Sequence, residues 1–176
     1  MLKVGDRFPD YKLTAVTGKT DKDFAEVTQD TYKGQWKVYF FWPKDFTFVC
    51  PTEIVGFGDM NDKFKACGAQ LIGASTDSDF VHAAWREHHE GLGKSPFPWL
   101  SDIKKELSCA LGILHEDAGV ANRATFIVDP DNTIRYVEMT DLSIGRNPFE
   151  TLRILDALQS DKLTPCGWKK GDKTLN

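Results

Sequence analysis

The sequence predicts one α/β domain with a mixed central β-sheet flanked by helices on both faces. Short apolar runs alternate with stretches of helical periodicity, and two strand-like runs on either side of Pro130 predict an antiparallel hairpin. A length of 176 residues fits one domain, and the chain has no internal repeat, linker or low-complexity segment. Both parallel and antiparallel neighbours are therefore expected within one sheet.

The first half of the chain predicts a strand, a loop and a helix in succession. Residues 35–42 are aromatic and β-branched, which is typical of a buried strand, and Pro43 ends it. Residues 43–50 form the loop, and the next helix starts at Cys50 or Pro51. The apolar stripe of this helix has amphipathic spacing and consists of Phe57, Met60, Phe64 and Cys67.

A second strand and helix follow, and a short third helix comes after them. Residues 69–76 predict an apolar strand, and residues 78–90 predict a helix that Gly91 ends. The segment 101–112 carries a helix signal in which Ser101 is the expected N-cap. These alternating elements favour a sheet covered by helices.

The last third of the chain predicts a hairpin, a helix and a tail. The strand-like runs 124–130 and 133–139 flank the turn-forming residues Asp-Pro-Asp-Asn, so they should pair antiparallel. Residues 148–160 have helical spacing, and the chain beyond them is polar. We therefore expect a domain over residues 1–160 and a loosely held tail over residues 161–176.

Composition and charge exclude several classes of protein. The 22 basic and 26 acidic residues give a net charge of -4 and a pI of about 5.6, which argues against a nucleic-acid partner. The longest purely apolar run, residues 38–42, is too short to span a membrane, and the charged first ten residues do not form a signal peptide. The cysteines form no CxxC pair, so neither a structural zinc site nor a dithiol redox motif is expected.

The segment with the most distinctive chemistry is 43–53, because it places Cys50 at a helix start. If Cys50 caps the helix, unpaired backbone N–H groups and the helix dipole point at its sulfur and stabilise the thiolate. The thiolate is the reactive form of cysteine, so Cys50 is a candidate nucleophile. The alternative is a small buried hydrophobic residue, which is the usual fate of a free cysteine.

Residues 43–53, PKDFTFVCPTE, resemble the PxxxTxxC active-site loop of peroxiredoxins. Four later segments resemble the same family in the same order: DSDFVHAAW, FPWLSDIKKELS, NRATFIVDPDNTIRY and IGRNPFETLRILDALQ. The resemblance covers nearly the whole chain and is to typical two-cysteine peroxiredoxins of the alkyl hydroperoxide reductase C type. It implies a thioredoxin-like fold and a peroxidase that uses thiols and no cofactor. Such an enzyme reduces hydrogen peroxide and organic hydroperoxides in antioxidant defence and redox homeostasis.

The resemblance makes Cys50 the peroxidatic cysteine, which attacks the peroxide and becomes a sulfenic acid. Thr47 and Arg123 would donate hydrogen bonds to the peroxide oxygens, and Arg123 would also keep the sulfur ionised. Pro43 would exclude water from the pocket. The ordinary alternatives are a loop hydroxyl bonded to its own backbone for Thr47 and a solvated charge for Arg123.

Two further residues of the family pattern have a supporting role. Glu53 either caps the start of the helix or positions Arg123. Arg146 resembles a second active-site arginine of the family, and its alternative is an exposed loop arginine.

A second thiol must capture the sulfenic acid before more peroxide oxidises it irreversibly. In most of the family this resolving cysteine lies four residues before a tail tryptophan, but Thr164 occupies that place before Trp168. Cys166 matches the second cysteine of a C-x-C subgroup, so it is our candidate for the resolving cysteine. Cys109 lies off the apolar face of its expected helix and is the alternative, whereas Cys67 is expected in the core.

The resemblance also implies partners. It implies a homodimer with an intersubunit disulfide, a ring of five or six dimers, and a reductant that is thioredoxin-like, a flavin disulfide reductase or a small dithiol protein. A transient catalytic disulfide in a chain without an export signal suits the cytoplasm. Two other functions stay open: a redox-regulated chaperone or sensor, and a metal protein. The metal would use His82, His88, His89 and Cys109, although their charged neighbours favour a solvated surface.

Overall fold

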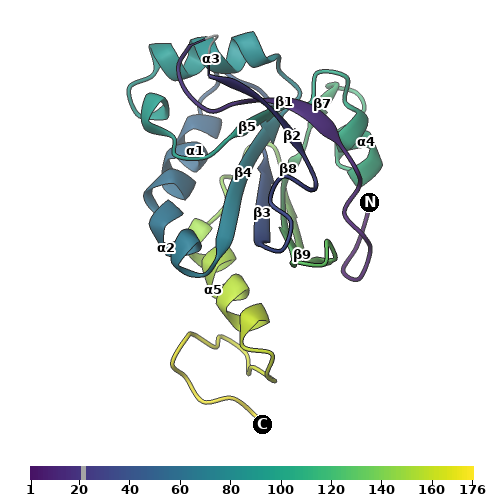
Figure 1. Ribbon diagram of the computed structural model, residues 1–176, viewed down its shortest axis with the longest axis vertical. Helices are drawn as coiled ribbons and strands as arrows, with labels where there is room; N and C mark the ends of the chain where they lie inside the picture. Colours follow the sequence, from purple (N-terminus) through teal and green to yellow (C-terminus); the bar gives the residue numbers. More distant parts are fainter. Residues whose placement is uncertain (21–22) are drawn as a thin grey trace.

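The computed structural model describes residues 1–20 and 23–176. Within these residues seven strands form one twisted sheet in the order β2-β1-β5-β4-β3-β8-β9 (Figure 1). The strands are β1 (Lys12–Val16), β2 (Phe24–Thr28), β3 (Trp36–Phe41), β4 (Ala69–Ser75), β5 (Trp99–Ser101), β8 (Arg123–Val128) and β9 (Ile134–Thr140). Strands β3, β4 and β5 run parallel, whereas β8 pairs antiparallel with both β3 and β9. The predicted mixed sheet is confirmed.

Helices cover both faces of the sheet. They are α1 (Cys50–Asp59), α2 (Asn61–Ala66), α3 (Asp79–His88), the 3₁₀ turn η1 (Leu92–Lys94), α4 (Glu106–Leu111) and α5 (Pro148–Gln159). A short hairpin of β6 (Leu114–His115) and β7 (Val120–Ala121) follows α4. Figure 1 shows α1 and α2 on one side of the sheet and α4 on the other. No helix in the described ranges is long and apolar enough to cross a membrane.

Strand β3 lies at the centre of the sheet and contributes to two hydrophobic cores. Because side chains alternate along a strand, Val38 and Phe40 face the core that α1, α2, α3 and α5 cover, and Tyr39 and Phe41 face the core beside α4. This explains why the strand reads as a continuous apolar run in the sequence. The loop that follows the C-terminal end of β3 leads directly into the start of α1.

The structure confirms the predicted strands around 35–42 and 69–76, the antiparallel hairpin and the helices that became α3 and α5. The side chain of Ser78 accepts a hydrogen bond from the Val81 N–H and caps α3. The predicted helix after Cys50 is divided at Met60 into α1 and α2. Strands β1, β2 and β5 and the β6–β7 hairpin were not predicted.

The predicted helix over 101–112 is wrong in its first half. Ser101 belongs to β5 and does not cap the helix. Lys105 has the left-handed backbone conformation, with φ of 62°, so α4 begins only after it. The cap is the carboxylate of Asp102, which accepts the backbone N–H groups of Leu107 and Ser108 at 3.1 and 2.8 Å.

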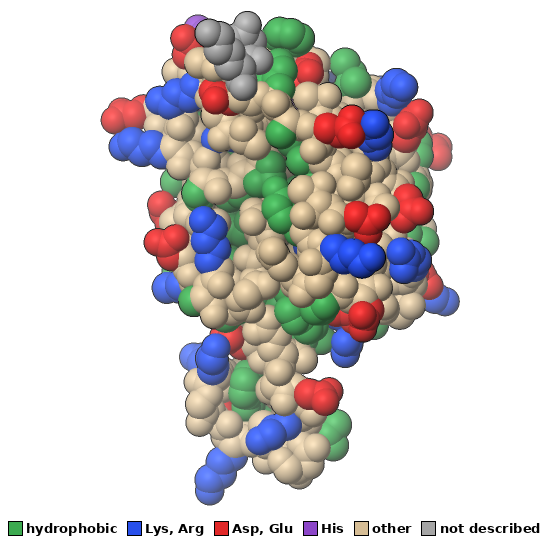
Figure 2. All heavy atoms as spheres, viewed as in Figure 1, with side chains coloured by type: hydrophobic (Ala, Val, Ile, Leu, Met, Phe, Trp, Pro, Cys, Tyr) green, Lys and Arg blue, Asp and Glu red, His purple; other side chains and the backbone are tan. Residues whose placement is uncertain are grey.

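The tail is held more firmly than its polar sequence predicts. Trp168 is only 5% exposed, and its carbonyl accepts a hydrogen bond from Arg153 of α5 at 2.8 Å. Lys170 forms an ion pair with Asp156 of the same helix at 2.8 Å. Figures 1 and 2 show the tail below α5, as a lobe with several basic side chains, while the body above it mixes charges of both signs.

Candidate active site

Cys50 is the first residue of α1 and lies on the loop that follows β3. Val49, not Cys50, precedes the helix, and Pro51 occupies the first turn, where its missing N–H costs nothing. The Cys50 side chain is 1% exposed and packs with Ile54 and Phe57. Cys50 is thus a buried thiol in the first turn of α1, at the positive end of the helix dipole.

Arg123, the first residue of β8, reaches this sulfur from the neighbouring strand. Its Nη1 donates to Cys50 Sγ at 3.3 Å and to Glu53 Oε2 at 2.7 Å, and its Nε donates to the Leu142 carbonyl at 2.7 Å. The guanidinium is 3% exposed, so it is not the solvated charge that was its alternative. A fixed positive charge and an N–H donor at the sulfur both stabilise a thiolate.

Glu53 and Arg146 hold Arg123 in place. Arg146 donates from its backbone N–H and Nε to Glu53 Oε1, both at 2.8 Å, and from Nη2 to Oε2 at 2.9 Å. Burial would raise the pKa of Glu53, but the hydrogen bonds and charge of Arg146 and the charge of Arg123 outweigh burial and lower it. Arg146 is 7% exposed, which excludes the exposed loop arginine.

These groups give the site a simple charge balance. Two arginines and one glutamate carry a net positive charge, and a Cys50 thiolate makes the four groups neutral together. Loss of the thiolate would leave a buried charge without its counter-ion, which is costly in a low-dielectric site. Cys50 therefore lies in one buried network with two arginines and a glutamate.

A cavity of about 310 Å³ opens beside Cys50. Its lining includes Pro43, Thr47 and Arg123, so the structure brings the predicted loop residues and the arginine together around the sulfur. Thr47 Oγ1 donates its proton to the Lys44 carbonyl at 2.9 Å, the backbone hydrogen bond of its ordinary alternative. The Thr47 oxygen keeps lone pairs for a ligand in the cavity.

A buried polar cluster behind the loop was missed at the sequence level. Asp45 accepts hydrogen bonds from Trp42 Nε1 at 2.7 Å and pairs with His82 Nδ1 at 2.6 Å. His82 is 0% exposed, so the predicted solvated surface is wrong for this histidine. Burial raises the pKa of Asp45, although His82 and Trp42 oppose the rise. The position of His82 three residues before Trp85, on the apolar face of α3, was the available signal.

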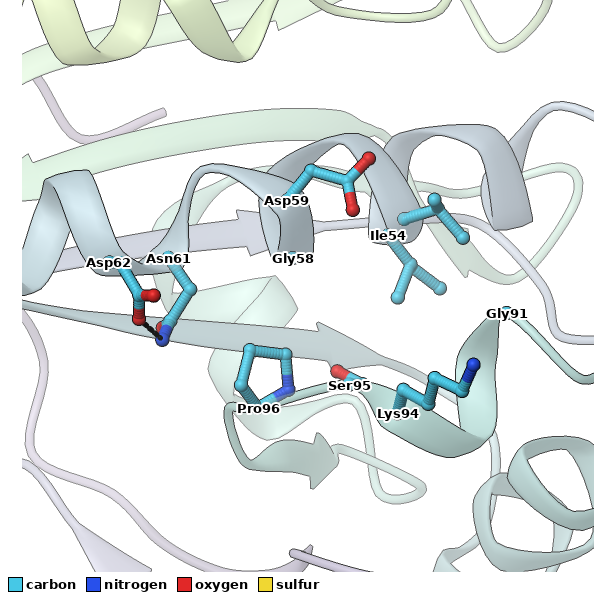
Figure 3. Close-up of a pocket in the computed structure, with 10 residues that line it drawn as sticks. Ile54, Gly58, Asp59, Asn61, Asp62, Gly91, Lys94, Ser95 and Pro96 are labelled. Carbon is cyan, nitrogen blue, oxygen red and sulfur yellow. Dashed lines mark hydrogen bonds between the residues drawn. The ribbon is translucent and has the colours of Figure 1, made fainter.

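The histidines and the cysteine of the metal-binding alternative are not grouped as metal ligands in the described residues. Among residues 1–20 and 23–176 no three histidine, cysteine or acidic side chains are grouped as metal ligands. A second hollow of about 370 Å³ lies between α1–α2 and the segment after η1 (Figure 3). Asp62 and Asn61 face one another there, and no cysteine lines it. The cavity beside Cys50 differs from this hollow in having a cysteine in its lining.

The other three cysteines lie apart from this site. Cys166 and Cys109 are exposed, on the tail and on α4. Cys67 is only half-buried at the core edge, where its Sγ donates to Asp156 Oδ1 at 3.4 Å and burial raises its pKa. Figure 1 shows the tail at the end of the molecule away from the start of α1. One chain by itself therefore does not bring Cys166 to Cys50.

A buried sulfur held by an arginine in a small cavity suits peroxide reduction, because the same arginine can bind the thiolate and the oxygen that leaves. The α/β architecture and this site together define a thiol peroxidase. Known proteins agree with this class.

Residues 4–137 match the AhpC/TSA family. The alkyl hydroperoxide reductase C of Mycolicibacterium smegmatis is 53% identical over 100% of this chain and 94% of its own length. The solved Mycobacterium tuberculosis AhpC has a TM-score of 0.87 and 52% identity, covering 96% of this chain and 99% of that one. A reduced Plasmodium vivax 2-Cys peroxiredoxin has a TM-score of 0.92 and 34% identity, covering 99% and 93%. The chain belongs to the AhpC/TSA family and is a peroxiredoxin enzyme with a thioredoxin-like fold, as its sequence predicts.

Proposed function

We propose that this peroxiredoxin reduces hydrogen peroxide and organic hydroperoxides through a sulfenic acid on Cys50. The observation that carries the proposal is the 3.3 Å hydrogen bond from Arg123 to the buried Cys50 sulfur beside an open cavity. The thiolate attacks the terminal peroxide oxygen, so an S–O bond forms as the O–O bond breaks. Two electrons pass from sulfur to the peroxide, and the leaving oxygen takes a proton from water to become an alcohol or water.

The loop and the arginine network divide the work of this step. Arg123 stabilises both the thiolate and the charge that develops on the leaving oxygen. Glu53 and Arg146 fix the direction of that guanidinium, since each bonds the other through several atoms. Thr47 accepts the peroxide O–H rather than donating to it, because its own proton is bound to the Lys44 carbonyl. Pro43 forms a wall of the cavity without a competing N–H donor.

The second step joins two subunits. The thiol of Cys166 attacks the Cys50 sulfenic acid of the partner subunit, forming an intersubunit disulfide and releasing water. The exposure of Cys166 and its place on the tail, away from its own Cys50, support a resolving thiol from a second copy. The exposed Cys109 is the alternative source of that thiol.

The enzyme then needs a reductant and an assembly. A thioredoxin-like protein, a flavin disulfide reductase or a small dithiol protein would supply two electrons to the disulfide. The dimers assemble five or six to a ring, as the resemblance to the family implies. The enzyme works in the cytoplasm, where it serves antioxidant defence and redox homeostasis.

One experiment tests both cysteines. Wild type, Cys50→Ser, Cys166→Ser and Cys109→Ser receive one equivalent of hydrogen peroxide, followed by non-reducing electrophoresis and mass mapping of crosslinked peptides. We expect a covalent dimer joining Cys50 to Cys166 that only the first two substitutions abolish. A crosslink to Cys109 would overturn the assignment of Cys166. Steady-state peroxide consumption with thioredoxin and its reductase separates an enzyme from a redox-switched chaperone.

A further inference from the structure

We propose that Lys44 makes this site selective for hydroperoxides that carry a carboxylate on an apolar chain, such as hydroperoxy fatty acids. The inference rests on the proposed function, because it concerns the substrate of the same cavity. It assigns Lys44 as a residue that determines specificity and leaves the chemistry to Cys50.

The cavity has an apolar wall, whereas hydrogen peroxide is a small polar molecule with no apolar group to bind there. Its apolar lining consists of Phe48, Val49, Ala118, Val120 and Leu142. Phe48 is 93% exposed at the mouth, so a hydrocarbon chain resting on it would remove both surfaces from water. A volume of about 310 Å³ is at the small end for ligand pockets and suits one segment of such a chain next to the sulfur.

Two cationic residues of the described chain, Arg123 and Lys44, line this cavity, and they differ in their ion pairs. Arg123 forms an ion pair with Glu53 and donates a hydrogen bond to Cys50 Sγ. Lys44 is exposed and forms no ion pair with any residue in the described ranges 1–20 and 23–176. Among the residues that the structure describes, none that lines the cavity is acidic. Lys44 therefore brings an uncompensated positive charge to an apolar mouth.

The neighbour of Lys44 explains why its charge stays free. Asp45 follows it directly, but its carboxylate is 1% exposed and is bound inward to Trp42 and His82. The Thr47 hydroxyl donates to the Lys44 carbonyl, so the loop holds these two residues side by side in the lining of the cavity. A carboxylate is the anion that such a lysine would attract at this point.

An amphiphilic hydroperoxide fits all three features at once. Its peroxide would lie against Cys50 and Arg123, its chain on the apolar wall and its carboxylate at Lys44. The reaction is the one already described: the Cys50 thiolate becomes a sulfenic acid, the hydroperoxy acid gains two electrons and a proton, and it leaves as the hydroxy acid. A neutral hydroperoxide of the same length would lose only the contact to Lys44.

The test uses linoleic acid hydroperoxide and its methyl ester, two substrates that differ in charge and share the peroxide and the chain. Both are assayed as monomers for kcat/KM, with hydrogen peroxide beside them. We expect the acid to exceed the ester by about 2- to 5-fold at low salt, the range of an exposed charge pair, and the excess to shrink in about 0.5 M salt. Lys44→Ala should bring the ratio to about one, Lys44→Arg should restore it, and Lys44→Glu should invert it.

Lys33→Ala is the matched control, since Lys33 is also exposed but does not line the cavity. Its acid-to-ester ratio should equal that of wild type. An unchanged ratio in Lys44→Ala, or a ratio of one in wild type, would overturn the assignment of Lys44. Hydrogen peroxide turnover by wild type keeps the two proposals distinct, because its absence would sink the proposed function itself.

Discussion

The two cysteines of the proposed cycle lie in opposite environments. Cys50 is 1% exposed, begins a helix and is bonded by Arg123, whereas Cys166 is exposed on the tail. Attack on a peroxide needs a sulfur that is already ionised and surrounded by fixed donors, because reorganising them during the reaction would raise the barrier. Capture of a sulfenic acid needs a thiol that can travel. In the proposed cycle, preorganisation therefore belongs to the segment of Cys50 and reach to the segment of Cys166.

The anchors of the two segments differ in the same way. The loop of Cys50 is held by buried polar groups: Glu53 forms ion pairs with Arg123 and Arg146, and Asp45 is hydrogen-bonded to His82. The tail is held near the surface, where Lys170 pairs with Asp156 while its side chain stays 69% exposed. Buried pairs are costly to break, and exposed ones contribute little. The four experiments below test this contrast, beginning with the largest expected effect.

The largest contrast is between the two serine variants. Cys50→Ser removes the nucleophile, so we expect peroxide consumption to fall by more than about 10³-fold. Cys166→Ser keeps the buried sulfur, so with peroxide at one equivalent it should still consume one peroxide per subunit, but without sustained turnover. Rapid-mixing measurement of the peroxide consumed per subunit checks both. A Cys50→Ser variant that still consumes one equivalent would move the nucleophile to another cysteine.

Arg123→Lys should lower kcat/KM by about 10²-fold while the tail is unaffected. A lysine cannot bond the sulfur, Glu53 and the Leu142 carbonyl with one planar group, and it loses the donor aimed at the leaving oxygen. Steady-state kinetics with hydrogen peroxide measures the loss, and the alkylation rate of Cys166 serves as the control. A loss below about 3-fold would mean that the helix start alone activates the sulfur.

Glu53→Gln should destabilise the fold by about 3 kcal/mol at neutral pH, because two arginines lose a buried counter-ion. The pKa of Glu53 is lowered from 4.5 in the folded state, so its stabilisation is fully present above about pH 4.5 and is lost as the pH falls through the folded pKa. Urea unfolding between about pH 3 and 7 should show wild type approaching the variant at low pH. Glu150→Gln, at a half-exposed pair, should change stability by less than about 1 kcal/mol. A constant gap between wild type and Glu53→Gln across this range would contradict the assignment.

The smallest effect is expected in the tail. Arg153→Ala removes the 2.8 Å hydrogen bond to the Trp168 carbonyl, so the segment around Cys166 should open more often. Hydrogen exchange by mass spectrometry should be faster in residues 165–172, with a change of less than about 1 kcal/mol in global stability. Faster exchange in β3 or α1 as well would show that the tail and the core unfold together.

The sequence predicts the elements with strong local patterns and misses those that depend on distant partners. The central strand β3 and helix α3 carry apolar runs, a cap and clear ends, whereas β5 has three residues after a proline-rich stretch and is a strand only because β4 and β1 pair with it. The start of α4 was misplaced because Ser101 is a good cap locally, while the left-handed Lys105 sets the real boundary.

The same distinction between local patterns and distant partners applies to the residues of the site. The spacing from Pro43 to Cys50 lies within one loop, so the motif alone identifies it. The contacts of Glu53 with Arg146 and of Asp45 with His82 join residues 93 and 37 positions apart, and only the folded sheet brings them together. Local sequence gives no measure of their burial, which is why an exposed arginine and a solvated histidine were the reasonable alternatives.

Arg123 does not depend on Cys50 for its position. If the cysteine swings out to meet another thiol, the guanidinium still has Glu53 at 2.7 Å and the Leu142 carbonyl at 2.7 Å, and Arg146 still holds Glu53. The arginine and glutamate side chains therefore keep their positions and charges while the sulfur is displaced. A returning cysteine would therefore meet the same guanidinium in the same place, because the contacts that position Arg123 do not include the sulfur.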